Sequence, residues 1–156
     1  MNVTMVHVLK RHLVPTLEML EQLVEGCPDE IWFNRQSGYW KHIFHAITGI
    51  EFWFRQEGEE FHKPNLNKGV SPDLDEESTE DPTKEEMRAY VKEMIAKSNS
   101  FIEHINDENV LEPSEVYNEL TKADMIVMQI RHIQHHVGYC NHILSSQHHK
   151  AVQWLD

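Results

Sequence analysis

The sequence lacks several features that mark whole classes of protein. Its 156 residues include only two cysteines, Cys27 and Cys140, which are far apart and show no C-x-x-C spacing. This usage favours reduced thiols over a disulfide framework. No apolar run approaches the ~18 residues of a membrane span, and the opening MNVTMVHVLKRH carries no secretory signal. We therefore expect a cytoplasmic protein.

Basic residues are also scarce. There are 14 Lys and Arg against 26 Asp and Glu, a net charge of -12 with histidines neutral, and no basic stripe interrupts that balance. Such a surface repels phosphate backbones and anionic lipids, so we expect neither nucleic acid nor membrane as a partner. The length and the 40% hydrophobic content suit a single domain over residues 1–156. Histidine, in contrast, is abundant, with 12 residues.

Apolar residues recur every three or four positions in four segments, which predicts an all-α fold. Two of the segments open with a capping-box pattern, TKEE at 83–86 and TKAD at 121–124. Pro15 lies inside the first segment and is expected to bend it. The predicted helices have roughly 18 to 25 residues and cover residues 6–26, 39–56, 84–105 and 122–145.

The stretch GEEFHKPNLNKGVSPDLDEESTEDP, residues 58–82, shows no helical or strand periodicity. It is rich in Pro, Gly, Asn, Ser and acidic residues, which predicts a loop. The fold is thus expected to be a four-helix bundle with a long connection between helices two and three. Loops of this length often act as lids or binding segments, and a solvated crossover is the alternative.

The last predicted helix contains the histidine-rich sequence RHIQHHVGYCNHIL, residues 131–144. On a helical wheel His132 and His136 lie about 40° apart within the apolar arc, whereas His135 and His142 lie at its edge. An i, i+4 pair of imidazoles on one face is a spacing that binds a metal ion. Hydrogen-bonded core histidines have the same pattern, so a third ligand is needed to decide. His135 and His142 could orient such ligands or simply titrate at the surface.

The second predicted helix, within YWKHIFHAITGIEFWF, offers His42 and His45 as that third ligand. His45 shares its face with Gly49 and Phe52, opposite an aliphatic stripe. We expect the stripe to pack into the core and the His45 face to line a pocket, with Gly49 leaving clearance beside the imidazole. Periodicity does not choose between His42 and His45. The stripe consists of Ile43, Ile47, Ile50 and Phe54.

Two of these segments resemble the DinB/YfiT-like family. GYWKHIFHAITGIEFWF is similar to that family's second-helix signature around its first histidine ligand, and RHIQHHVGYCNHIL is similar to its final H-x-x-x-H followed by glycine. The opening through CPDEIWF is also similar in layout, so the resemblance covers nearly the whole chain. Family members are small four-helix bundles, often dimeric, with three metal-binding histidines. The resemblance implies His45, His132 and His136 as metal ligands, and a homodimer.

The resemblance also implies a chemistry. Three neutral imidazoles leave a divalent ion, Zn or Ni, with an open position. Characterised relatives include transferases and isomerases that use low-molecular-weight thiols such as bacillithiol or mycothiol. The expected function is therefore a metal-dependent transferase that activates such a thiol toward a small-molecule substrate. The alternatives are a metal-dependent hydrolase of a small ester or amide, a non-catalytic metal-binding or ligand-binding stress protein, or a metal-free bundle that acts through protein contacts.

Other polar and aromatic residues of the two helices are secondary candidates. Glu51 could serve a hydrolase as general base, but its position about 120° around the helix from His45 favours a solvated or packing role. Tyr139, Trp40 and Trp53 could line a substrate pocket, and each also fits a place in the core.

Overall fold

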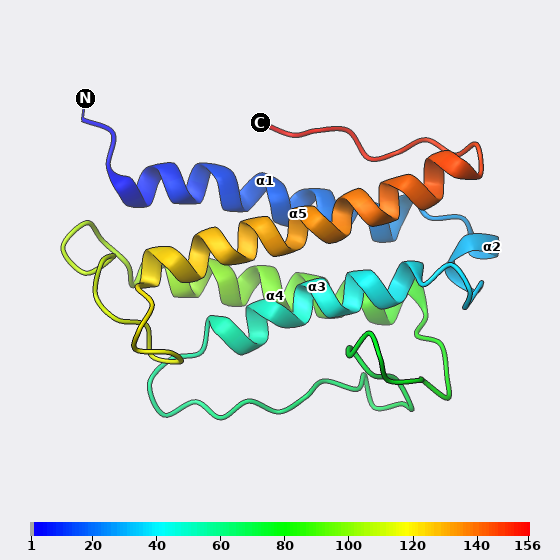
Figure 1. The fold of residues 1–156 in the computed structure, drawn as a ribbon, viewed down its shortest axis with the longest axis horizontal. Helices are drawn as coiled ribbons and strands as arrows, with labels where there is room; N and C mark the ends of the chain where they lie inside the picture. Colours follow the sequence, from blue (N-terminus) through cyan, green and yellow to red (C-terminus); the bar gives the residue numbers. More distant parts are fainter. Residues whose placement is uncertain (1) are drawn as a thin grey trace.

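The computed structural model describes residues 2–156, and within that range it contains helices and no strand (Figure 1). The four long helices confirm the predicted all-α fold. The short second helix was not predicted, and α3 has 15 residues, fewer than expected. The elements are α1 (Met5–Gly26), α2 (Asp29–Trp32), α3 (Tyr39–Trp53), α4 (Lys84–Glu103) and α5 (Lys122–Ser146).

The helix boundaries follow local sequence signals. Both capping boxes are present: the Thr83 hydroxyl accepts from the Glu86 amide, whose carboxylate accepts from the Thr83 amide, and Thr121 pairs with Asp124 in the same way. The prediction that the second helix reaches about residue 56 was wrong. α3 ends at Trp53. Phe54 is buried, and its ring stacks on the Phe101 ring of α4 with 4.2 Å between centroids.

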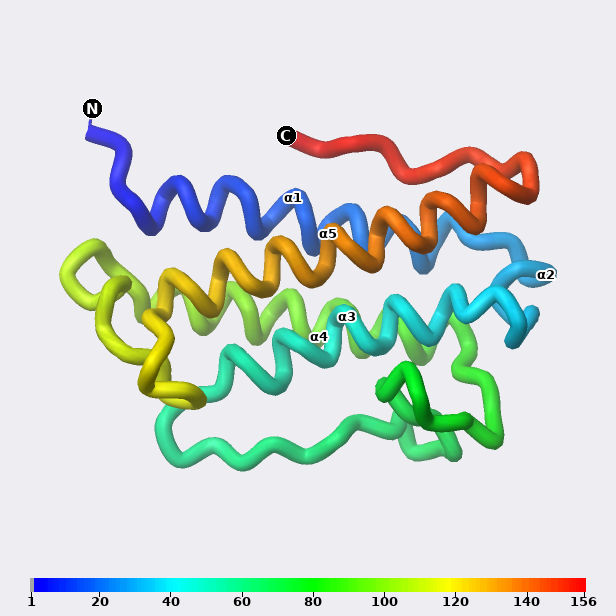
Figure 2. Tube along the Cα trace, viewed as in Figure 1, coloured from blue at the N-terminus to red at the C-terminus, as the bar shows by residue number. Residues whose placement is uncertain are grey.

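The four long helices run along a common axis, as Figures 1 and 2 show. α5 packs against α1 and α3, and α4 packs against the same two helices from the other side. α3 and α4 are parallel, because Phe44 meets Tyr90 near their starts and Phe54 meets Phe101 near their ends. Parallel neighbours require a crossover connection, and this is why the segment between α3 and α4 is long.

The core lies between the four helices. The predicted aliphatic stripe of α3 is buried, with Ile43, Ile47 and Ile50 fully inaccessible to solvent. The Tyr39 hydroxyl at the start of α3 donates to the Leu23 carbonyl of α1 at 2.6 Å. In the range that the structure describes, no helix combines the length and the apolar character needed to cross a bilayer.

The connection between α3 and α4 travels the length of the bundle and is fixed at its second half (Figure 2). Trp32 donates its Nε1–H to the Pro82 carbonyl at 2.8 Å, and Arg35 donates to the Ser78 carbonyl at 3.1 Å. Lys41 of α3 bonds the Glu76 carbonyl. These contacts hold the loop, which the sequence predicted as non-helical, against α2, the turn that follows it and the first turn of α3.

Candidate metal centre

Three imidazoles from two helices converge at the α3–α5 contact. The ring centroid of His45, from α3, lies 5.0 Å from that of His132 and 4.9 Å from that of His136, and the two α5 rings are 4.8 Å apart. One ring nitrogen of each residue lies within 4.8 Å of the others. The structure therefore brings together the three histidines that the family resemblance selected.

The backbone approach that permits this convergence depends on a glycine. A Cβ at Gly49 of α3 would lie 2.5 Å from the Gln129 Oε1 atom and 3.1 Å from the His132 Nδ1 atom of α5. Any larger residue would push these side chains away. Gly49 thus provides clearance, as predicted, but for His132 and Gln129 of the facing helix.

Hydrogen bonds hold the second nitrogen of two of the three rings. His45 Nδ1 lies 3.1 Å from the Pro72 carbonyl oxygen of the long loop, and because a carbonyl only accepts, this nitrogen carries the proton. His136 Nδ1 lies 2.8 Å from His42 Nδ1. In both rings Nε2 remains available, and fixing a ring by its distal nitrogen is the usual way in which proteins orient metal-binding histidines.

The α5 imidazoles are uncharged at neutral pH. Burial, together with the neighbouring His45 and His135, lowers the pKa of His132 to about 4. Burial and the adjacent histidines lower the pKa of His136 to about 3. A neutral imidazole keeps a lone pair for coordination, so both side chains are in the form that binds a cation.

A buried acceptor beside His132 supports the fit of a metal ion. Gln129 is 1% exposed, and its Oε1 atom has no hydrogen-bond partner within residues 2–156. This atom and His132 Nδ1 both lie near the position that a Cβ of residue 49 would occupy. A His132 that uses Nε2 as a ligand carries its proton on Nδ1, next to that acceptor. Three imidazole nitrogens suit a divalent ion such as zinc or nickel.

The family comparison agrees with this geometry. The family model of the DinB superfamily matches residues 12–140, a range that includes all three histidines. The chain belongs to the DinB superfamily. No curated protein and no solved structure matches it. Membership of the DinB superfamily and the three-histidine cluster together fit metal binding.

Other candidates from the sequence lie outside the cluster of this DinB-superfamily protein. His135 and His142 are exposed on α5. Glu51 accepts a hydrogen bond from the Tyr90 hydroxyl of α4, which agrees with a packing role. Tyr139 is 44% exposed and stacks on the His42 ring at 3.7 Å between centroids. Periodicity had not indicated the contact between His42 and His136.

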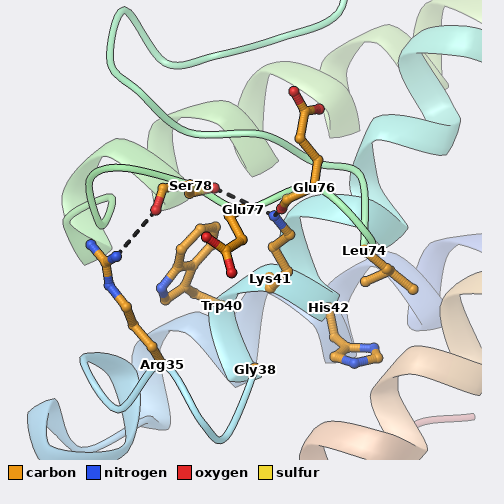
Figure 3. Close-up of a pocket in the computed structure, with 9 residues that line it drawn as sticks. All are labelled: Arg35, Gly38, Trp40, Lys41, His42, Leu74, Glu76, Glu77 and Ser78. Atoms are coloured by element: carbon orange, nitrogen blue, oxygen red, sulfur yellow. Dashed lines mark hydrogen bonds between the residues drawn. The ribbon is translucent and has the colours of Figure 1, made fainter.

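A cavity of about 390 Å³ lies beside His42, between α3 and the long loop (Figure 3). Its α3 wall contains Trp40, Lys41 and His42, and the long loop supplies the facing wall from Leu74 to Ser78. Trp40, for which the sequence left a pocket or a core role open, borders this cavity and is 5% exposed in the core, whereas Trp53 lies at a separate small cavity. None of the three clustered histidines lines this cavity; His42 lines it, and its Nδ1 atom lies 2.8 Å from that of His136.

A Gly49→Ala substitution is expected to weaken Zn²⁺ binding by about 10-fold, because the new methyl group displaces Gln129 and His132. The matched control is Gly138→Ala in α5, where a Cβ meets nothing within 4 Å. The control should keep the affinity of the native protein and gain up to about 1 kcal/mol in unfolding free energy from helix propensity. Competition titration with a chromophoric chelator and urea unfolding measure the two quantities. Equal zinc affinities in both variants would contradict the proposed clearance role.

Proposed function

We propose that this protein is a metal-dependent transferase that joins a low-molecular-weight thiol to a small electrophilic molecule. The observation that carries the proposal is the set of three imidazoles, His45, His132 and His136, with one nitrogen of each within 4.8 Å of the others. A cavity of small-molecule size lies next to His42, the neighbour of His136. A divalent ion held by these nitrogens would supply a Lewis acid with an open position that lowers the pKa of a bound thiol.

The protein's own thiols support an external thiol as cosubstrate. Cys27 and Cys140 are both buried and free. Burial raises the pKa of Cys27 to about 12 and raises that of Cys140 as well, so both remain protonated and unreactive at neutral pH. Thiol chemistry at the three-histidine centre therefore needs a thiol from solution.

The cavity suits a polar cosubstrate. The ammonium group of Lys41, the carboxylate of Glu77 and the indole of Trp40 border the space, whereas the Glu76 carboxylate points away from it and accepts from Lys63 and Ser71 (Figure 3). These groups offer partners for the amino and carboxylate groups that a cysteine-derived thiol carries. In the proposed reaction the thiol loses its proton, its sulfur bonds to the electrophilic carbon, and the leaving group departs with that proton.

The hydrolase alternative is less well supported by the carboxylates near the centre. Hydrolysis of an ester or amide needs a general base within reach of the attacking water. Glu51, the candidate base on α3, is half-buried and bonded to Tyr90 of α4. A transferred thiolate needs no such base once its proton has been lost.

The test is turnover by purified untagged protein loaded with zinc or nickel. Bacillithiol, mycothiol or cysteine is offered together with a chromogenic aryl halide, and thiol consumption is followed with product absorbance. We expect metal-dependent product formation that His132→Ala abolishes, while Glu51→Gln retains most of the rate.

The other outcomes identify the alternatives. Ester or amide hydrolysis without thiol would assign the protein to the hydrolases. Stoichiometric metal binding with no turnover across the panel would assign it to metal-binding or ligand-binding proteins. An unchanged rate after chelation, or in His132→Ala, would overturn the metal-dependent mechanism.

A further inference from the structure

A fourth histidine contacts the three-histidine cluster through a hydrogen bond. His42 lies on α3 one turn before His45, and its Nδ1 atom is 2.8 Å from Nδ1 of the buried His136. His42 is not one of the three residues whose nitrogens converge. Its contact with the cluster is therefore through the Nδ1 atom of His136.

The short Nδ1–Nδ1 distance determines where both protons lie. A neutral imidazole has one N–H and one lone pair, so one Nδ1 atom must donate and the other must accept. A His136 that uses the Nε2 lone pair for a metal ion carries its proton on Nδ1 and is the donor. His42 is then the acceptor, and its own proton lies on Nε2.

The His42 ring is itself held in place. It stacks on Tyr139 with 3.7 Å between centroids and 20° between planes. An acceptor fixed in this way orients its donor firmly, because little side-chain freedom remains to be lost on hydrogen bonding.

His45 has a different kind of hydrogen-bond acceptor for its Nδ1–H. His45 Nδ1–H has a loop carbonyl, that of Pro72, as acceptor. His136 lies in the middle of α5, where backbone carbonyls are engaged in the helix, so the acceptor for its Nδ1–H must come from a side chain. His42 is the side chain that α3 presents there.

We propose that His42 is a positioning residue that accepts a hydrogen bond from His136 Nδ1–H and thereby directs His136 Nε2 toward the metal ion. The inference rests on the proposed metal-binding function. It assigns a specific role to a histidine outside the ligand set, and it predicts that metal affinity depends on the acceptor at position 42.

The experiment compares Zn²⁺ affinities by competition with a chromophoric chelator. His42→Phe keeps an aromatic ring against Tyr139 but removes the acceptor, and we expect binding 10–100-fold weaker, as about 10–100-fold is usual for such partners. His42→Asn places an amide oxygen near the Nδ1 position and should restore most of the affinity. His135→Phe is the matched control, because the His135 ring also lies 5.0 Å from that of His136 but is exposed. The control should bind like the native protein.

A second measurement does not depend on a variant that folds. Nitrogen NMR of the zinc-loaded native protein should show His136 protonated at Nδ1 and His42 protonated at Nε2. The reverse assignment, or native affinity in a folded His42→Phe variant, would overturn the positioning role and leave the metal site standing. Absence of zinc binding by the native protein would instead overturn the proposed function and this inference with it.

Discussion

His136→Ala is expected to weaken Zn²⁺ binding by more than about 100-fold. Removing a group that only orients a ligand costs about 10–100-fold, and removing a ligand itself should cost more. His136 is 4% exposed, and its ring is near both other imidazoles, so its removal leaves two donors. His142→Ala, on the same helix but exposed, is the control and should keep native affinity.

The loss of zinc affinity in His136→Ala should also reduce the stabilisation of the folded protein by zinc. A metal ion that binds only the folded chain adds about 2.7 kcal/mol to the unfolding free energy at a free concentration of 100 times Kd. Urea unfolding with and without zinc should show this gain for the native protein and for His142→Ala, and should lose it for His136→Ala. A gain of equal size in all three proteins would mean that the zinc binds elsewhere.

Trp32→Ala is expected to lower the unfolding free energy by about 3–5 kcal/mol, the usual cost of removing a large buried aromatic side chain. Trp32 is fully buried and donates to the Pro82 carbonyl, so its loss also frees the end of the long loop. Phe33 is its neighbour in sequence but is 50% exposed, and Phe33→Ala should change stability by no more than about 0.5 kcal/mol. Urea unfolding of both variants makes the comparison, and similar losses would contradict the anchoring role of Trp32.

Much of the fold could be predicted from local sequence because its signals act within a few residues. The Thr83 and Thr121 capping boxes begin α4 and α5, and the apolar period of α3 marks the face that is buried. Tertiary contacts shifted the details. α3 ends at Trp53, where Phe54 packs against Phe101, and α2 is a single turn whose apolar residues, Ile31 and Trp32, are buried.

The site could be predicted in part. The i, i+4 spacing of His132 and His136 placed both on one face of a helix, but periodicity alone left His42 and His45 open, and the family signature selected His45. A helical wheel gives the direction of a side chain from its own axis. It does not give the rotation of one helix against another, so the His42–His136 contact and the Gly49–Gln129 approach were not predictable from it.

By itself the sequence determined an all-helical chain, the starts of its long helices and an inward pair of imidazoles on the last one, because period and capping are properties of neighbouring residues. Only the tertiary structure decided how α3 faces α5, which nitrogen of His45 and of His136 is held by a hydrogen bond, and where the loop borders a cavity. Those features depend on side chains from distant segments packing together, and their geometry is set by the contact itself.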